Sequence, residues 1–145
     1  MFQQQHGSSV VVGVDRRDND HAVLGAALVQ VRHTGQRLRV VHAIEPGTAP
    51  ALTGRAEREA HRQSVEDDLR RRTEKLFAEQ EASADVEYEV SRGDPATVLL
   101  GAARSAGMIV IGTHGTEHRP PFLLGTVSQD VAVHATCPVL LVPTA

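Results

Sequence analysis

One segment of the sequence has the residue types and the spacing of a phosphate-binding loop. Gly112 and Gly115 follow a short apolar run, and nine residues separate Gly115 from the run 125–128, Gly-Thr-Val-Ser. Glycines allow the backbone to turn tightly and to approach a ligand without a Cβ in the way. A helix that begins near residue 126 would present backbone N–H groups to an anion at its electropositive end. The hydroxyl groups of Thr126 and Ser128 could add hydrogen bonds to a phosphate or to a metal bound by it.

This segment differs from two common nucleotide-binding motifs. No lysine follows its last glycine, as the P-loop pattern requires. The dinucleotide fingerprint falls after the first strand, and the first apolar run, residues 10–14, carries no glycine cluster. On spacing alone, a surface loop with turn glycines remains the alternative to a ligand site.

The histidines of the segment have a spacing that could suggest a metal site. His114 and His118 are four residues apart, with Glu117 between them. That spacing aligns ligands on a helix, whereas these residues fall in a predicted loop without a further ligand nearby. We therefore expect no dedicated metal site, a phosphate or ribose contact for His114, and an exposed His118. We expect His42 to be packed within its strand rather than to act as a catalytic base.

The elements that must position this segment alternate between strands and helices. Strands are predicted at residues 10–14, 37–44, 85–90, 108–111 and 139–142. Helices are predicted at about residues 21–33, 55–81, 95–105 and 126–135. Strict alternation favours one five-stranded parallel α/β sheet, doubly wound, with helices on both faces.

Cap and turn residues mark the ends of two helices. Asn19 or Asp20 could cap the first helix, and Gly35 could end it. Asp94 is the expected N-cap of the third helix, with Pro95 at its first position.

The second helix is strongly charged and has a thin apolar stripe. The stripe consists of Val65, Leu69, Leu76 and Phe77, which predicts an amphipathic helix on the surface. We expect the Arg70-Arg71-Arg72 run to be a solvated face rather than a docking patch.

Three predicted strands end at residues that could form one site. Asp15 follows the first strand, Ala43 lies at the end of the second, and the loop from Gly112 follows the fourth. Ligands of such sheets bind beyond the carboxyl ends of the strands, where the strand order reverses. We therefore expect these residues to converge on one cleft.

The composition is that of a globular protein in a reducing compartment. Of 145 residues, 41% are apolar and 23% charged, and the net charge of -3 gives no drive toward nucleic acid or an anionic membrane. The single cysteine, Cys137, excludes an internal disulfide, and we expect it to be buried or interfacial. No apolar stretch approaches a membrane span, and residues 1–9 have no signal-peptide pattern. We expect a disordered tail at 1–9, a single domain at 10–145, and a cytoplasmic protein.

The whole chain, from Val10 to Pro143, resembles the universal stress protein family. The matching segments are 10–15, Val40-Val41-His42, Gly93-Asp94-Pro95, the glycine-spaced segment and 137–143. The Gly-x2-Gly-x9-Gly-Ser/Thr motif is typical of the ATP-binding branch of that family. The resemblance implies a Rossmann-like fold of the adenine nucleotide alpha hydrolase-like type, with strand order 3-2-1-4-5.

The resemblance also implies roles for individual residues. Asp15 would hold the adenosine end of ATP (or AMP or ADP), and the backbone at Ala43 would read the adenine edge. The remaining implied contacts are Gly112, His114 and Gly115 with the ribose and phosphates, and Gly125, Thr126, Val127 and Ser128 with the phosphates. Mg²⁺ would bridge the phosphates, and the last strand, 139–142, would form a homodimer.

Three hypotheses for the function follow. The first is a nucleotide-dependent stress-response or regulatory module that hydrolyses ATP slowly or not at all. The second is a weak ATPase or phosphoryl-transfer enzyme in which Asp15 or His114 positions water or a metal. The third is an interaction protein with an empty pocket, which the intact motif glycines disfavour.

The sequence departs from the family pattern at three places. Arg16-Arg17 follows Asp15 where small or hydroxyl residues are usual, and these cations could contact phosphate or point to solvent. His114 stands where arginine is frequent. Pro120-Pro121 stiffens a loop that is usually rich in glycine, which affects loop closure more than binding.

Overall fold

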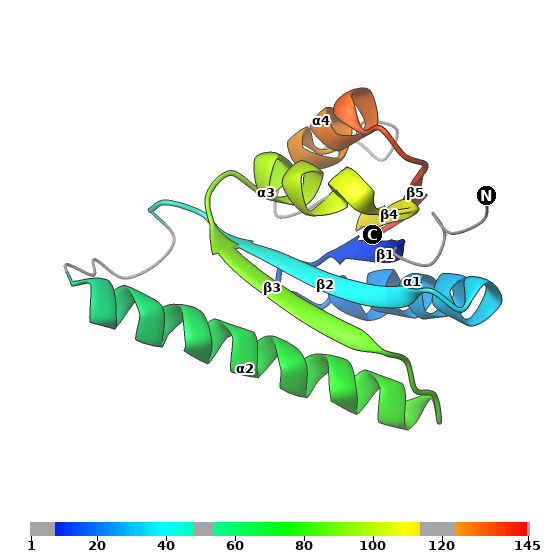
Figure 1. The fold of residues 1–145 in the computed structure, drawn as a ribbon, viewed down its shortest axis with the longest axis horizontal. Coiled ribbons are helices and arrows are strands. Elements are labelled where there is room, and N and C mark those ends of the chain that lie inside the picture. The colour runs from blue at the N-terminus through cyan, green and yellow to red at the C-terminus, as the bar shows by residue number, and fades with distance from the viewer. Residues whose placement is uncertain (1–7, 48–53, 114–123, 145) are drawn as a thin grey trace.

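The computed structural model describes residues 8–47, 54–113 and 124–144, which form an open parallel sheet with helices on both faces (Figure 1). The strands are β1 (Ser9–Gly13), β2 (Arg37–Ile44), β3 (Val86–Arg92), β4 (Met108–Gly112) and β5 (Val139–Val142). The helices are α1 (Asp20–Thr34), α2 (Arg55–Glu79), α3 (Pro95–Ala102), the 3₁₀ turn η2 (Ala103–Ser105) and α4 (Thr126–His134). The strand order is β3-β2-β1-β4-β5, and each neighbouring pair is parallel. The predicted fold class and strand order are confirmed.

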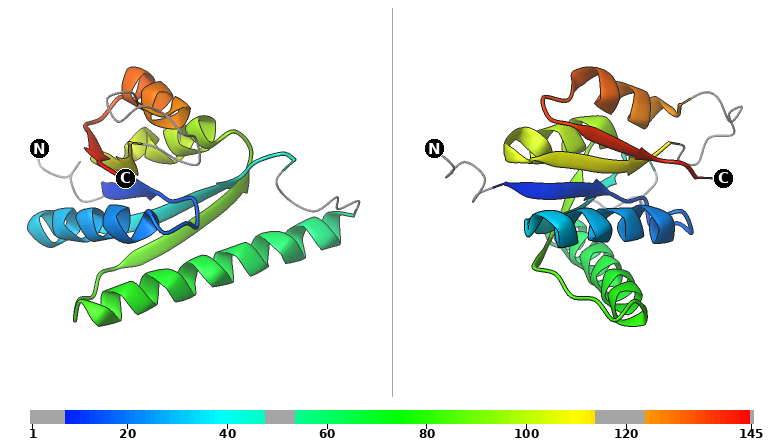
Figure 2. Two further views of the ribbon diagram at one scale, coloured as in Figure 1. Left: turned by 180° about the vertical axis from the view of Figure 1, so that it is seen from behind. Right: turned by 90° about the vertical axis from the view of Figure 1, so that its right-hand side faces the viewer.

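The two faces of the sheet bury separate cores. Figure 2 shows α1 and α2 on one side of the sheet and α3 and α4 on the other. Val10 and Val12 of β1 pack in the first core with residues of α1 and α2, whereas Val11 packs in the second core with residues of α3, β4 and α4. Successive side chains of a strand point to opposite faces. A strand covered on both faces is therefore apolar on both, as Val10 to Val12 of β1 are.

The edge strand β3 is covered on one face only. Val86, Tyr88 and Val90 face the core beneath α2. The alternate residues Glu87 and Glu89 form ion pairs with arginines of β2. This difference between the two faces explains why the sequence alternates cleanly in β3 and not in β1.

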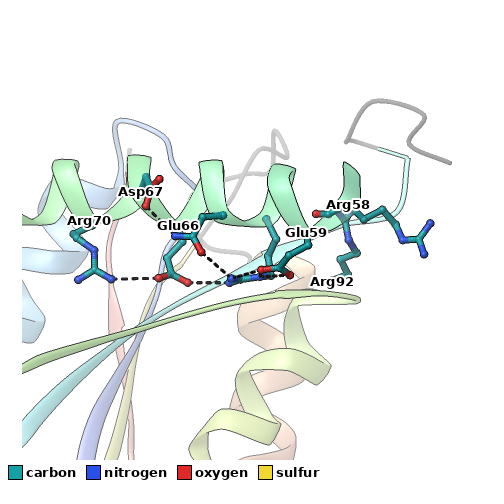
Figure 3. A network of polar contacts seen from close by, with 8 residues as sticks. Arg58, Glu59, Glu66, Asp67, Arg70 and Arg92 are labelled. Carbon is teal, nitrogen blue, oxygen red and sulfur yellow. Dashed lines mark hydrogen bonds and ion pairs between the residues drawn. The ribbon is translucent and has the colours of Figure 1, made fainter. Parts of the chain in front are cut away.

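The surface of α2 carries a row of guanidinium–carboxylate pairs (Figure 3). Arg62 pairs with Glu59 at 2.9 Å and with Glu66 at 2.8 Å, and Glu66 also pairs with Arg70 at 3.2 Å. The guanidinium of Arg70 lies 4.4 Å from the centre of the Tyr88 ring. Such i, i+3 and i, i+4 pairs stabilise a helix, and exposed pairs do so only weakly.

The remaining predictions for α2 agree with the structure. Arg71 and Arg72, like Arg70, pair with carboxylates of their own helix and are largely exposed. The run is thus a surface face with internal ion pairs. The predicted apolar stripe, Val65, Leu69, Leu76 and Phe77, is buried, and Thr73 is buried with it.

Helix ends follow the predicted caps in two of three cases. Asp94 accepts a hydrogen bond from the Thr97 N–H at 3.0 Å, and Pro95 begins α3. Gly35 ends α1 in the left-handed conformation, with φ 72°. At the start of α1 the predicted side-chain cap is wrong: Asn19 occupies the N-cap position without a capping hydrogen bond, and Asp20 is already helical. The Asp20 carboxylate binds a backbone N–H outside the helix instead.

Two glycine-to-alanine substitutions are expected to change stability in opposite directions. A Cβ on Gly13 would lie 2.8 Å from Leu99 Cδ2 and 3.0 Å from Ile111 Cγ2, in the core beneath α3. Gly13→Ala should therefore lower the free energy of unfolding by about 1–3 kcal/mol, because the added methyl group collides with the side chains of Leu99 and Ile111, which must shift. A Cβ on Gly25, within α1, meets nothing within 4 Å. Gly25→Ala should raise the free energy of unfolding by about 0.5–1 kcal/mol.

Urea denaturation of both variants measures these changes. An equal or greater stability of Gly13→Ala relative to the parent protein would contradict the packing described at the end of β1.

Candidate functional site

A cleft of about 600 Å³ opens where the strand order reverses, between the ends of β1 and β4. It is lined by the turn after β1, the end of β2, the start of α3, the end of β4 and the start of α4. The predicted site residues that line it are Asp15, Ala43, Gly112, Gly125, Thr126, Val127 and Ser128. His114, Gly115, Glu117, His118 and Pro120-Pro121 lie outside the described residues. The predicted convergence of three strand ends is therefore observed, whereas the contacts of these residues with a nucleotide stay predictions.

Hydrogen bonds join the end of β4 to the start of α4. The Gly125 N–H donates to the Thr113 carbonyl at 2.8 Å. The Ser128 Oγ lies 2.9 Å from the same carbonyl and 3.1 Å from the Gly125 carbonyl. The buried Ser128 hydroxyl therefore donates its proton within the protein. It holds the helix start in place, which spacing alone could not reveal.

The start of α4 lines the cleft. Thr126 is the first residue of the helix and is exposed, and Val127 is half-buried. The N–H groups of the first turn of an α-helix have no acceptor within the helix. They carry the positive end of the helix dipole, which favours an anion at this wall of the cleft.

Two aspartates lie together at the opposite wall, after β1. The Asp15 N–H donates to Asp20 Oδ1 at 3.0 Å. Asp15 Oδ1 and Asp20 Oδ2 are both buried and have no hydrogen-bond partner among the described residues. Burial, together with the charge and side chain of the neighbouring Asp15, raises the pKa of Asp20 to about 7. Asp20 is a cleft residue that the sequence interpretation took for a helix cap.

The His42 side chain links the end of β2 to the end of β1 through a hydrogen bond. Its Nδ1 lies 2.8 Å from the Val14 carbonyl, and the Val14 N–H donates to the Val41 carbonyl at 3.0 Å. Because a carbonyl only accepts, Nδ1 carries the ring proton. Burial lowers the pKa of His42, and the nearby Arg16 lowers it too. The ring is bonded within the sheet, as predicted, and it also lines the cleft.

The two arginines after Asp15 separate in the structure. Arg16 has a φ of 65° and pairs through Nε with Asp68 of α2 at 3.0 Å. Phosphate contact and solvent exposure are the two roles that the sequence leaves open for Arg16. The structure shows an ion pair instead, which links the turn after β1 to α2. Arg17 is exposed at the border of the cleft.

Close packing against neighbouring side chains, as well as the cleft, accounts for a glycine at position 112. A Cβ at this position would lie 3.1 Å from Thr144 Cγ2 and 3.4 Å from Val23 Cγ2. The glycine allows the end of β4 to lie close to α1 and to the chain after β5. Its closeness to a ligand remains a prediction.

The cleft thus combines three environments. Carboxylates line one wall, the electropositive start of α4 forms another, and apolar side chains lie between them, among them Val41, Leu99 and Ile111. An elongated ligand with a hydrogen-bonding end and an anionic end fits this pattern. Within residues 8–47, 54–113 and 124–144, no three metal-ligating side chains form a cluster that could hold a metal ion. In the same part of the chain, no helix has the length and apolar character to cross a membrane.

Comparison with known proteins agrees with this architecture. A model of the universal stress protein family matches residues 8–143. The chain belongs to the universal stress protein family. A universal stress protein of Thermus aquaticus is 35% identical over 142 residues, which cover 92% of this chain and 97% of the relative. The chain spans about half the length of its universal stress protein relatives from Mycobacterium tuberculosis.

Solved universal stress proteins share the fold. One that was determined in complex with cAMP has a TM-score of 0.69 and 23% identity, and the match covers 95% of this chain and 98% of the other. Another, from Archaeoglobus fulgidus in complex with dAMP, has a TM-score of 0.60 and 22% identity, with 93% and 97% covered. The predicted family is confirmed.

Proposed function

We propose that this universal stress protein binds ATP, or AMP or ADP, in the cleft at the strand-order reversal. The observation that carries the proposal is the placement of the start of α4 and of Asp15 on walls of the same cleft. Two relatives of the same fold bind adenine nucleotides, cAMP and dAMP. A helix start favours phosphate and a carboxylate favours the hydroxyl and amine donors of a nucleoside.

Each end of the nucleotide has groups suited to it. The phosphates would accept hydrogen bonds from the backbone N–H groups at Val127 and Ser128 and from the Thr126 hydroxyl. The adenosine would lie between the apolar side chains, with Asp15 as acceptor and the Ala43 backbone at the adenine edge. Mg²⁺ would come with the nucleotide and be held by phosphate oxygens.

We further propose that the bound nucleotide acts as a regulatory signal in a stress response rather than as a substrate. His42 is neutral and bonded to the Val14 carbonyl, and Arg16 is bonded to Asp68, so neither is poised to act on a phosphate. Turnover should therefore lie far below about 1 per second, the low end of typical enzymes. Faster release of phosphate from Mg-ATP would favour a weak ATPase instead.

Isothermal titration with Mg-ATP tests the binding itself. We expect one site per chain with a dissociation constant between about 1 µM and 1 mM, which corresponds to roughly 4–8 kcal/mol. Absence of binding at millimolar Mg-ATP, AMP and ADP would contradict the proposed function.

We also propose a cytoplasmic homodimer that forms through β5. This strand lies at one edge of the sheet and pairs with β4 on its other side. The residues Val139–Val142 are apolar and only half-buried. An apolar edge strand is a ready partner for a second copy. Sedimentation showing only monomer at micromolar concentration would contradict the dimer.

A further inference from the structure

We propose that Asp20 is a positioning residue of the cleft: its carboxyl group carries a proton at neutral pH, donates it to Asp15, and so holds Asp15 for nucleotide binding. The inference rests on the nucleotide site proposed above. It assigns to Asp20 a role beyond that of a residue in a helix start.

The hydrogen bonds of Asp15 and Asp20 leave one oxygen of each carboxyl group to be satisfied. Asp20 Oδ1 accepts from the Asp15 N–H, and Oδ2 of Asp20 and Oδ1 of Asp15 are buried without a hydrogen-bond partner among the described residues. A carboxylate oxygen only accepts hydrogen bonds, so two ionised groups cannot satisfy each other. One proton between the two oxygens gives both of them a partner. Leaving both unsatisfied would cost the desolvation of two charged groups.

The electrostatic surroundings favour the protonated form of Asp20. Asp20 is 7% exposed, and it is more deeply buried than Asp15. Burial disfavours the charged form of a carboxyl group, and a second carboxylate beside it disfavours that form further. The proton therefore resides on Asp20, and the raised pKa of Asp20 agrees with this.

Nearby cations do not replace the proton. The charged and titratable side chains that border the cleft, besides the pair, are Arg16, Arg17, His42, Glu45 and Asp94. Arg16 is paired with Asp68 of α2, Arg17 is exposed, and burial lowers the pKa of His42, which keeps it neutral. Glu45 and Asp94 add negative charge. Among the described residues, the surroundings of Asp15 and Asp20 thus favour a proton on this pair of carboxyl groups.

The shared proton has a consequence for the ligand. It fixes Asp15 in one orientation, so that Asp15 can accept a hydrogen bond from a nucleoside hydroxyl or amine. Loss of the proton to water above neutral pH leaves two adjacent negative charges, which repel each other and the phosphates of the nucleotide. Nucleotide binding should therefore take up a proton and weaken as pH rises through about 7.

The substitution Asp20→Asn isolates the proton. An asparagine can accept from the Asp15 N–H through its oxygen and donate to the Asp15 carboxylate through its amide, as the protonated acid does. Its amide does not titrate. Asp20→Ala removes both bonds and should weaken Mg-ATP binding even at pH 6, which the asparagine variant should not.

The experiment has two arms. In the nucleotide-free protein, carboxyl carbon-13 NMR should show Asp20 titrating near pH 7, far above the ordinary value of about 3.9. In the second arm, dissociation constants for Mg-ATP are measured from pH 6 to pH 8.5 for the parent protein and Asp20→Asn. The dissociation constant of the parent protein divided by that of Asp20→Asn should be near one at pH 6 and reach about ten at pH 8.5. Titration of a single group permits at most about a tenfold change per pH unit. Titration of Mg-ATP itself cancels in this ratio.

Each outcome decides a separate point. An Asp20 carboxyl that titrates below about pH 5, near its ordinary range, overturns the shared proton. Titration near pH 7 with a ratio that stays at one overturns the positioning role. Absence of Mg-ATP binding by either protein at every pH overturns the proposed function and the positioning role with it, whereas the NMR arm still decides the proton.

Discussion

Thr126→Glu should weaken Mg-ATP binding by at least about 100-fold while the protein stays folded. Thr126 is the exposed first residue of α4 and lines the cleft. A carboxylate there interacts favourably with the helix dipole, by about 0.3–1 kcal/mol, so the fold should be at least as stable. The same carboxylate stands where the phosphates are proposed to bind. Two like charges 4 Å apart repel by about 4 kcal/mol at an effective dielectric constant of 20, more than the 2.7 kcal/mol of a 100-fold loss.

The matched control is Thr126→Gln, which has nearly the size of glutamate and no charge. It should bind Mg-ATP within about threefold to fivefold of the parent protein, since less than 1 kcal/mol is at stake. Isothermal titration gives the affinities, and thermal unfolding shows that both variants are folded. Unchanged affinity in Thr126→Glu would place the phosphates away from α4.

Asp20→Asn should stabilise the protein at and above neutral pH. The pKa of Asp20 is raised from 3.8 to about 7 in the folded state. Between these values the folded state holds a proton that the unfolded state has lost, so the stability from this group falls as pH rises from about 4 to 7. Above pH 7 the full penalty applies, on the order of a few kcal/mol for a shift of this size. Asparagine has no such penalty.

Urea unfolding from pH 4 to pH 8.5 measures this difference. The difference in the free energy of unfolding between Asp20→Asn and the parent protein should be small at pH 4, increase up to about pH 7, and then stay constant. Asp18→Asn is the control, because it makes the same substitution at an exposed aspartate of the same turn. A difference that is the same at every pH would show that Asp20 does not titrate in this range.

Features that depend on local patterns could be predicted from the sequence. The continuous apolar runs of β1 and β4 predict strands buried on both faces, and the alternation of β3 predicts a strand with one charged face. Asp94-Pro95 predicts the start of α3 because a cap and a fixed φ act within one turn. Once these elements are placed, the position of Asp15, Ala43 and Gly112 at the strand-order reversal follows from the topology.

Features that depend on distant partners could not be predicted. Asp20 precedes an apolar helix face as a cap would, and only the folded turn shows that its carboxylate meets Asp15 instead. The partner of Arg16 is Asp68, 52 residues away on α2. The spacing of Ser128 within the motif is the same whether its hydroxyl faces a ligand or the Thr113 carbonyl.

An NMR titration of the amide-labelled protein with Mg-ATP tests whether the cleft at the strand-order reversal binds an adenine nucleotide. We predict saturable shifts of the backbone amides of Asp15, Ala43, Val127 and Ser128, from three separate segments that line this cleft. Amides away from the cleft, such as those of Arg70 in α2 and Glu87 in β3, should not shift. No shifts at all, or shifts confined to α2 and β3, would contradict the account.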